Sequence, residues 1–442
     1  MNYRRKKILV SWYTNPLYIP PFTLTGSQVT VGPRFWPDQR LLMYSGWTPV
    51  GSYDLREALQ RAALPTEYDA IVVWADARGS NFPMNLGAFD CPKVLCVGDT
   101  HHMKTPLDAM LSYAIRARYD FILSSHNRQH LHWFTEAGFA NVAWIPGLKV
   151  RHVPRPIGGS RKGTVAFIGG TGDFHPRRKR LLAELERQGA PLSTAVALRD
   201  PSADVYASSA VSFNASLNGD LNLRVFEILS AGGCLLTDRL SRESGLDLLL
   251  KEGRVFLAYD TPEECVDQAR MLLKNPEAAL DLSRHGHQTF VQTMLPEQRT
   301  SELLNWVFEG RLDSLFRVDQ QSPREGGGAN LNDRVRVYQE LQELHRLEEA
   351  PQVLFTADVP AAYLADVLDL SRLRLFIGCV DDRPFVGPSQ ETQQRYTVAD
   401  RNRIESTIWD CVVATEATAL PPPIRSRQVL RSRPRPIAQR SD

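Results

Sequence analysis

The chain has 442 residues, of which 43% are hydrophobic and 23% charged, a balance typical of globular proteins with sizeable cores. Domains usually run ~100–200 residues, so we expect two or three of them. The net charge of +2 excludes a strong overall field for polyanions, and the sequence has no apolar run near the ~18 residues of a membrane span.

The N-terminal stretch MNYRRKKILVSWYTNP has a basic start and a short apolar run that Asn15 and Pro16 interrupt. A signal peptide needs a longer apolar core and a small-residue cleavage site, so we expect a first strand here. The six cysteines are scattered without paired or metal-ligand spacing, which indicates buried free thiols in a reducing compartment. These features predict a cytoplasmic protein.

Residues 1–150 alternate short apolar runs with helical patterns. The predicted strands are Ile8–Trp12, Ala70–Ala75, Val94–Val97, Phe121–Ser124 and Val142–Ile145. The predicted helices are Leu55–Ala63, Leu107–Ala117 and Arg128–Glu136. Strands alternating with helices indicate βαβ units, and nearly continuous apolar strands are typical of a parallel sheet covered on both faces. We therefore expect an α/β domain over residues 1–150.

Asp99, His101 and His102 follow the strand in KVLCVGDTHHMKTP, at the carboxyl end where ligands of open α/β sheets bind. A carboxylate or an imidazole there suits proton transfer near neutral pH, and Asp99 is either a base or the group that orients a histidine. The alternative is a turn capped by Asp99 with two solvated or hydrogen-bonded histidines. A further alternative is a metal site that adds the histidines of the next loop, His126, His130 and His132.

The stretch from Pro146 to Gly163 is rich in turn-forming and charged residues, which predicts a linker. Beyond it the alternation of strands and helices restarts. The predicted strands are Thr164–Ile168, Val211–Ala215, Cys234–Thr237 and Val255–Ala258. The predicted helices are Arg177–Gln188, Leu223–Ala231 and Pro262–Lys274, and long helical patterns continue to residue 316. We therefore expect a second α/β domain over residues 160–316.

The first strand of this second domain leads into a glycine-rich loop and a helix, FIGGTGDFHPRRKRLLAEL. Gly169 and Gly170 allow close backbone approach, and Arg178 lies in a basic group at the start of the helix, just after Pro176. The pattern is neither a full P-loop nor GxGxxG, so alone it is weak. Its position at the carboxyl end of a strand favours a ligand site.

The stretch SLNGDLNLRVFEILSAGGCLLTD crowds polar groups at the start of a helix. Asp220 and Asn222 are both suitable N-cap residues, and Gly232 with Gly233 ends the helix. The helix N-terminus and the Arg224 guanidinium suit phosphate oxygens, while Glu227, one turn on, suits two ribose hydroxyls. The set therefore predicts a nucleoside diphosphate site. The alternative is a surface Arg–Glu pair on a capped helix, which contributes little.

The run NLRVFEILSAGGCLLTD resembles the donor-binding segment of GT-B glycosyltransferases, and its N-x-R-x-F-E pattern is similar to that of the CgeB-like branch. The resemblance covers roughly residues 1–316. It implies two Rossmann-like domains facing a cleft, an N-terminal acceptor domain (1–150) and a C-terminal domain (160–316) that binds a sugar nucleotide as co-substrate. It implies neither a metal nor another cofactor.

The resemblance also implies roles for single residues. Glu227 contacts the nucleotide ribose, and Arg224 lies near the diphosphate. The full expected donor-binding set is Gly169, Gly170, Arg178, Asn222, Arg224 and Glu227. One position departs from the family pattern: many retaining GT-B enzymes carry a second Glu eight positions before the ribose-binding one, and here that position is Gly219, with Asp220 the nearest acid. The departure leaves the stereochemical outcome open.

Beyond a second predicted linker, 322–333, we expect an accessory α/β extension over residues 334–417 and a disordered basic tail over 418–442. The predicted strands of the extension are Val353–Thr356, Leu373–Ile377 and Cys411–Ala414, and its predicted helices are Arg334–Glu349, Ala361–Leu370 and Ala399–Trp409. Docking or oligomerisation is the role expected for the extension. The tail, with six arginines and five prolines, is expected to be solubilising, with nucleic-acid binding as the alternative.

Together these features predict a glycosyltransferase that moves a sugar from a UDP-, GDP- or ADP-sugar to an acceptor hydroxyl. Two alternatives stay open. One is a sugar-nucleotide epimerase or hydrolase of the same fold, and the other is a non-catalytic GT-B scaffold that binds a partner. Fold analogy names neither the sugar nor the acceptor.

Overall fold

The computed structural model describes residues 3–20, 22, 27–34, 43–101, 103–318, 330–378, 395–416, 420 and 424–432. His102, Cys379 and most of the two predicted segments 322–333 and 418–442 lie outside the described residues. The chain forms two compact units, Met1–Gln321 (unit 1) and Ser322–Asp442 (unit 2). Unit 1 contains two sheet-based halves, and unit 2 has a sheet and a core of its own.

The first half of unit 1 is built on a seven-stranded parallel sheet in the order β3-β2-β1-β5-β7-β8-β9. Its strands are β1 Lys7–Ser11, β2 Ser27–Pro33, β3 Gly46–Thr48, β5 Ala70–Ala75, β7 Lys93–Val97, β8 Phe121–Ser124 and β9 Val142–Trp144. The five strands predicted here are confirmed, and β2 and β3 are additions. The strand order reverses between β1 and β5, which is the switch point where an open α/β sheet leaves a crevice at its carboxyl edge.

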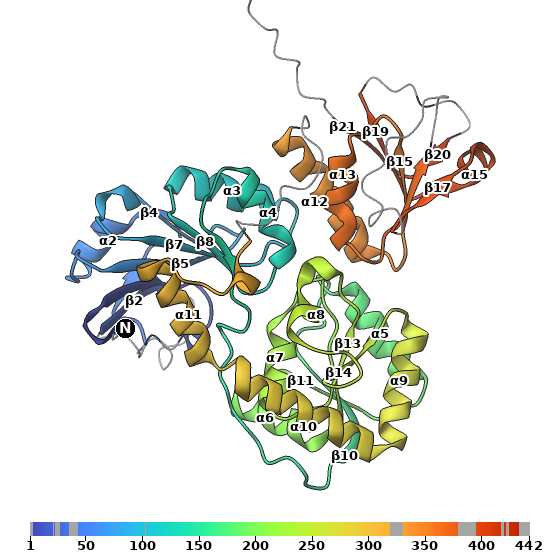
Figure 1. The fold of residues 1–442 in the computed structure, drawn as a ribbon, viewed down its shortest axis with the longest axis horizontal. Helices are drawn as coiled ribbons and strands as arrows, with labels where there is room; N and C mark the ends of the chain where they lie inside the picture. The colour runs from blue at the N-terminus through green and yellow to red at the C-terminus, as the bar shows by residue number, and fades with distance from the viewer. Residues whose placement is uncertain are drawn as a thin grey trace, which may run out of the picture. The chain divides into compact units, whose positions relative to one another are not determined.

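Short helices connect the strands of this first sheet (Figure 1). They are α2 Leu55–Arg61, α3 Pro106–Ala117 and α4 His132–Glu136, with the 3-10 turns η2 Pro16–Tyr18, η4 Leu86–Ala88 and η5 Arg128–His130. A small parallel ribbon pairs β4 Gly51–Asp54 with β6 Asn81–Met84. The helix predicted over residues 128–136 is therefore divided into η5 and α4.

The second half is built on a five-stranded parallel sheet in the order β11-β10-β12-β13-β14. Its strands are β10 Lys162–Ile168, β11 Leu192–Ala195, β12 Ser209–Phe213, β13 Leu235–Asp238 and β14 Phe256–Tyr259. Its helices are α5 Pro176–Arg187, α6 Asp200–Ser208, α7 Leu223–Ser230, α8 Leu246–Leu249, α9 Pro262–Lys274 and α10 Pro276–Thr293. The predicted strands and helices are confirmed. The prediction missed β11, because the edge sequence LSTA carries no apolar run.

Each half of unit 1 has its own apolar core. Strands β1, β5, β7, β8 and β9 contribute to the first core, and helix α11 (Pro296–Glu309) adds Leu303, Leu304 and Trp306 to it. In Figure 1, α11 lies beside the strands of the first sheet. This differs from the predicted extent of the second domain, 160–316, because the apolar face of α11 is buried against the first sheet and not the second.

Unit 2 holds a five-stranded parallel sheet in the order β17-β16-β15-β19-β21. Its strands are β15 Gln352–Thr356, β16 Arg374–Gly378, β17 Thr397–Ala399, β19 Cys411–Thr415 and β21 Val429–Ser432. Its helices are α12 Leu331–Leu347, α13 Ala361–Asp366 and α15 Arg401–Ser406, with the turn η8 Val367–Asp369. Strands β15, β16 and β19 and helices α12 and α13 confirm the α/β pattern predicted for the extension.

Two predictions for unit 2 are wrong. The helix predicted over residues 399–409 covers only α15, because β17 precedes it and β18 (Ile408–Trp409) follows it. The tail is not disordered over residues 424–432, since β20 (Arg425–Ser426) pairs with β18 and β21 pairs with β19. Burial of Leu430 and the backbone bonds to β19 outweigh the high arginine content of the segment.

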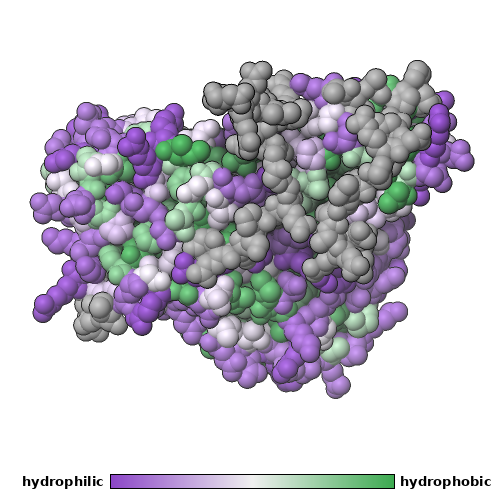
Figure 2. All heavy atoms as spheres, turned by 45° about the horizontal axis from the view of Figure 1, so that its top comes forward, coloured by the Kyte–Doolittle hydropathy of each residue, from purple (hydrophilic) through white to green (hydrophobic). Residues whose placement is uncertain are grey.

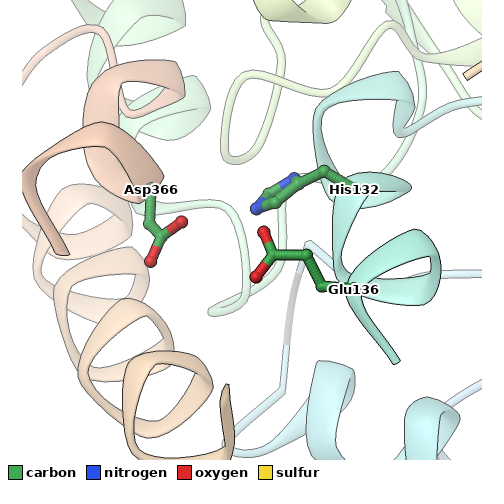
Figure 3. Close-up of side chains that lie close together, drawn as sticks. All are labelled: His132, Glu136 and Asp366. Carbon is green, nitrogen blue, oxygen red and sulfur yellow. The ribbon is translucent and has the colours of Figure 1, made fainter. Parts of the chain in front are cut away.

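Buried polar side chains join α12 to α13 in unit 2. The Arg334 guanidinium donates to both carboxylate oxygens of Asp366, at 2.8 and 2.7 Å, and Figure 3 draws Asp366 on its helix. The Tyr363 hydroxyl donates to Asp333 at 2.6 Å. Such a pair fixes geometry, because removal of either partner leaves a buried charge unpaired.

The surface of the molecule is mixed in polarity. The face drawn in Figure 2 carries many hydrophilic side chains with apolar ones between them. Among the described residues, no helix combines the length and the apolar character needed to cross a membrane. Cys96, Cys234, Cys265 and Cys411 are buried free thiols, as predicted, and Cys91 is a half-buried one.

Candidate functional site

The start of helix α7 is set by its local sequence. Asn222 has an extended backbone and forms the N-cap, and Gly232, at φ +75°, follows the helix end in the left-handed region, both as predicted. The apolar residues of α7 are buried, which leaves Arg224 and Glu227 on its partly exposed face. The Asn222 side chain makes no capping bond, and both of its polar atoms are buried without a hydrogen-bond partner.

Arg224 lies against the glycine loop that follows β10. Its Nε donates to the carbonyl of Ile168 at 2.6 Å, and its Nη1 donates to Oδ1 of Asn214 at 2.8 Å. Gly169 has φ +145°, and a Cβ at this position would lie only 2.3 Å from Nη2 of Arg224. The close approach of the guanidinium to the loop therefore requires glycine at position 169.

Arg178, near the start of α5, reaches the same loop. Its Nη1 donates to the carbonyl of Gly170 at 2.8 Å, and its Nη2 donates to that of Ala215 at 3.1 Å. The guanidinium carbons of Arg178 and Arg224 lie 5.5 and 4.6 Å from the ring centre of Phe167. The two cations thus share one aromatic ring beside the glycine loop.

The two guanidinium groups are not neutralised. Among the described residues, neither Arg178 nor Arg224 has a carboxylate oxygen within the 4.0 Å limit of an ion pair. Burial lowers the pKa of Arg178 to about 10, and the Arg224 charge is the second cause. The preceding residue differs, since Arg177 donates to Asp238 at 3.0 Å in a buried ion pair. A buried cation without a direct ion pair is costly, and an anion placed near Arg178 and the half-buried Arg224 lowers that cost.

Glu227 lines a small hollow that is partly open to solvent. The Tyr18 hydroxyl, which comes from η2 in the first half, donates to Oε1 of Glu227 at 3.2 Å. Burial raises the pKa of Glu227, while Arg224 and Tyr18 oppose that rise. A carboxylate at the wall of a hollow has free lone pairs, and it can accept bonds from two neighbouring hydroxyls of a ligand.

Two carboxylates follow neighbouring strands of the first sheet. Asp76 comes directly after β5 and Asp99 soon after β7, and these strands pair in parallel. Gly98 allows close packing here, because a Cβ would lie 2.8 Å from the Tyr13 hydroxyl and 3.2 Å from Cβ of Asp76. Burial, with the Asp99 charge as the second cause, raises the pKa of Asp76 to about 6, and Arg78 leads the effects that oppose this rise. A carboxyl group with this pKa suits proton transfer near neutrality.

His101 is buried where the two halves of unit 1 meet. Its Nε2 lies 3.6 Å from Oδ2 of Asp220, and its Nδ1 lies 3.0 Å from the amide nitrogen of Asn127. Its carbonyl accepts a bond from Asn218 at 2.6 Å. Burial alone would raise the pKa of Asp220, but His101 and the backbone N–H of Leu217 lead the effects that hold it below its usual value. Polar contacts thus join the halves just before α7.

His126 and Lys149 add to the polar edge of the first sheet. Burial holds the pKa of His126 well below its usual value, and the Lys149 charge acts in the same direction, so this imidazole is neutral at pH 7. Burial also lowers the pKa of Lys149, while Asp99 leads the opposing charges. The Lys149 ammonium lies 5.4 Å from the ring centre of Trp74. The edge therefore combines carboxylates, an ammonium group and a neutral imidazole.

The other histidines considered for a metal site make separate contacts. His130 Nδ1 lies 2.7 Å from the Thr100 hydroxyl, and His132 Nδ1 lies 2.8 Å from the Gln129 carbonyl. Figure 3 shows His132 and Glu136 projecting from the same side of α4. Taken by itself, the described part of unit 1 brings no three metal-ligating side chains within 4.8 Å of one another.

The structure places the predicted site residues at two sheet edges. The residues of the donor-binding set lie on the loop after β10, at the start of α5 and on the first turns of α7: Gly169, Gly170, Arg178, Asn222, Arg224 and Glu227. Asp99 and His101 lie together after β7, while His102 lies outside the described residues.

Sequence reasoning missed four side chains of these edges. Asp76 carries the signal that selected Asp99, an acid just after an apolar strand, and the same rule finds it. Tyr18 and Lys149 come from turns and the linker, and Tyr206 comes from the unpredicted helix α6. Their positions depend on long-range packing, which a local pattern does not encode.

Comparisons with known proteins agree with this architecture. Residues 178–305 match the family model described as Glycosyl transferase-like. No curated protein sequence matches the chain significantly. Among solved structures, Anabaena HepE in complex with UDP and glucose is similar, with a TM-score of 0.52 and 12% identity over 69% of this chain and 100% of that one. The structure of the same protein in complex with UDP-glucose has a TM-score of 0.50 and 12% identity over 68% of this chain and 99% of that one.

A weaker likeness is to the apo form of the lipopolysaccharide outer core galactosyltransferase WaaB, with a TM-score of 0.45 and 11% identity over 70% of this chain and 100% of that one. The CgeB-like branch stays a prediction. The two parallel-sheet halves of unit 1 have the GT-B fold, as the sequence resemblance implied. This chain thus carries a glycosyl transferase-like region, residues 178–305, on a GT-B fold.

Proposed function

We propose that the protein is a glycosyltransferase that moves a sugar from a nucleoside-diphosphate sugar to an acceptor hydroxyl. The match of residues 178–305 and the GT-B fold support transfer from sugar nucleotides in general. The observation that carries the proposal is the pair of uncompensated cations, Arg178 and Arg224, on the ring of Phe167 beside the glycine loop.

The diphosphate is the part of the donor that this pair would hold. Each guanidinium spends two N–H groups on carbonyl or amide oxygens, and it keeps further donors for a ligand. The start of α7 adds free backbone N–H groups and the unpaired amide of Asn222. The same groups would stabilise the negative charge that grows on the diphosphate as it departs, which is often a large term in catalysis.

Glu227 would bind the nucleoside. It lies one turn beyond Arg224 on α7, and its carboxylate can accept from two ribose hydroxyls. The similar Anabaena protein is described in complex with UDP-glucose, which favours a sugar nucleotide as the ligand here. Asn222 and Gly170 would complete the donor-binding set.

The carboxylates of the first half would serve the acceptor. In the transfer, the bond from the anomeric carbon to the diphosphate breaks, and a bond from that carbon to the acceptor oxygen forms. The acceptor hydroxyl releases a proton, and Asp99, with Asp76 beside it, is the group we assign to receive it. His101 bonds across to the second half, so its role would be to hold the halves together while the site excludes water.

The test compares Glu227→Gln with Glu186→Gln, an exposed control on α5. Affinity for UDP, GDP and ADP is measured by calorimetry, and turnover is followed as nucleoside diphosphate release from the sugar donors with a library of acceptor alcohols. We expect at least one nucleotide to bind, and the loss of a charged hydrogen bond to weaken it about 10- to 100-fold in Glu227→Gln only.

Five outcomes would contradict the proposal. If none of the nucleotides binds, or if Glu227→Gln binds as tightly as the control, the donor site is wrong. Release of nucleoside diphosphate that is equally fast without acceptor would support a hydrolase. Conversion of the sugar nucleotide into another one without such release would support an epimerase. Tight binding without turnover on any acceptor would support a non-catalytic scaffold.

A further inference from the structure

Arginines line the hollow beside Glu227. Arg151, from the segment that joins the halves, donates its Nε to the Leu17 carbonyl at 2.8 Å, and Arg199 forms the N-cap of α6. Among the described residues, neither has a carboxylate oxygen within the 4.0 Å limit of an ion pair. Burial lowers the pKa of Arg151 to about 10, and the Arg199 charge is the second cause. The hollow is thus lined by the half-buried Arg151 and the exposed Arg199, whose charges repel each other.

Two further features mark this hollow as a ligand site. The backbone of Arg199 has φ +55° and ψ −120°, a conformation that residues with a side chain rarely adopt. Strained positions of this kind gather at binding sites. The Tyr206 hydroxyl lines the hollow, is buried and makes no hydrogen bond of good geometry. Burial and the Glu227 charge raise its pKa, and the nearby Arg224 opposes that rise. A buried hydroxyl without a partner is costly until a ligand satisfies it.

The wall beyond Glu227 offers mainly hydrogen-bond donors. Guanidinium groups only donate, whereas Ser202 and Tyr206 can both donate and accept. The edge of a nucleobase far from its ribose carries an oxo group in uracil and hypoxanthine, and an amino group in cytosine and adenine. An oxo group accepts hydrogen bonds from the arginines. An amino group is disfavoured there, because its N–H donors would face the N–H donors of two cations.

We propose that Arg151 and Arg199 make this hollow select nucleotides whose base carries an oxo group at that edge over those that carry an amino group. The inference rests on the proposed function, because the ribose is placed at Glu227 and the base then extends toward the start of α6. It narrows the donor to a uridine- or guanosine-type sugar nucleotide and excludes an ADP-sugar.

Two matched ligand pairs test this inference. UDP differs from CDP, and IDP differs from ADP, at the oxo or amino position of the base edge. The hollow should accept either the pyrimidine pair or the purine pair, depending on the size of the base that fits it. In that pair we expect the nucleotide with the oxo group to bind at least ~10-fold tighter than the one with the amino group, since a bidentate arginine contact discriminates by about this factor or more. Because the Arg199 side chain is exposed, Arg199→Met can be made with little effect on the fold. In this variant the ratio of the affinities for the oxo and amino nucleotides should fall about fivefold. The control Arg187→Met, at an exposed position on α5, should leave the ratio unchanged. Arg151→Met should act in the same direction.

The outcomes separate this inference from the proposed function. If none of the four diphosphates binds, both fail. If they bind and weaken in Glu227→Gln, but the amino member binds as tightly as the oxo member, only the base selectivity is wrong. A preference for the oxo member that survives in both Arg199→Met and Arg151→Met would also overturn the assignment, because other groups would then read the base.

Discussion

The carboxyl edges of the two sheets in unit 1 carry different sets of charged groups. The first edge gathers the carboxylates Asp76 and Asp99, and the second gathers the guanidinium groups of Arg178 and Arg224. Both halves are parallel α/β sheets, so the fold alone does not set this difference. The difference comes from the residues of the loops and helix starts that lie beyond the strands. This difference agrees with the proposal that one edge accepts a proton and the other binds an anion.

Within the cationic edge, two neighbouring arginines have different surroundings. Arg177 is paired with Asp238, which also accepts bonds from the backbone and the hydroxyl of Ser216 at 2.9 and 2.5 Å. Arg178 has no such carboxylate among the residues that the structure describes. We infer that Arg177 stabilises the fold and that Arg178 binds the diphosphate, and mutation of each arginine tests this difference.

The largest effect on stability is expected for Arg177→Met. The change leaves the buried Asp238 without its cation, which costs about 3–5 kcal/mol in the free energy of unfolding. Urea unfolding of unit 1 measures it, with Arg187→Met as control, since exposed Arg187 should change stability by less than about 0.5 kcal/mol. A loss below about 1 kcal/mol in Arg177→Met would show that the ion pair is not structural.

A smaller, pH-dependent effect is expected for Asp76→Asn. The folded-state pKa of Asp76 is about 6 against an ordinary value of 3.8, so folding favours the protonated form. That stabilisation is complete below pH 3.8 and is lost as the pH rises through about 6. The asparagine side chain of the variant cannot ionise, so the stability of the variant relative to the wild type should rise by up to about 3 kcal/mol between about pH 4 and pH 7.5.

Urea unfolding at both pH values, with exposed Asp90→Asn as the control, checks this expectation. The Asn side chain can still accept the backbone bond from Arg78 that Asp76 accepts at 3.1 Å, so the change removes charge with little change in contacts. A stability difference that is the same at both pH values would mean that Asp76 is ionised like a surface carboxylate. The acidic edge would then lose its suitability for proton transfer near neutrality.

Much of this site was accessible from the sequence because its signals are local. The N-cap Asn222 and the terminating Gly232 bound α7 within one residue of the prediction, and the glycine loop follows its strand as expected. A cap, a helix period and a glycine each act over a few residues, so a single sequence encodes them. The same local rule selected Asp99 and, applied to β5, would have selected Asp76.

The remaining features depend on contacts that are distant in the sequence. Tyr18 reaches Glu227 across 209 positions, and α11 crosses to the core of the first sheet. Strand β21 is stabilised by pairing with β19, although its composition favours disorder. The position of Asp238 in the fold also decides that Arg177 is paired and that Arg178 is not paired with it. No rule of sequence spacing predicts which of two adjacent arginines makes such an ion pair.

The central claim is that the uncompensated cations of the second edge bind a diphosphate. It is tested most directly by calorimetry of the best-binding nucleoside diphosphate against the wild type and the folded double variant Arg178→Met, Arg224→Met, at low and high salt. We predict that the double variant binds at least about 100-fold more weakly, with a flatter salt dependence, and that Arg187→Met binds like the wild type. Affinity of the folded double variant within about twofold of the wild type would contradict the claim.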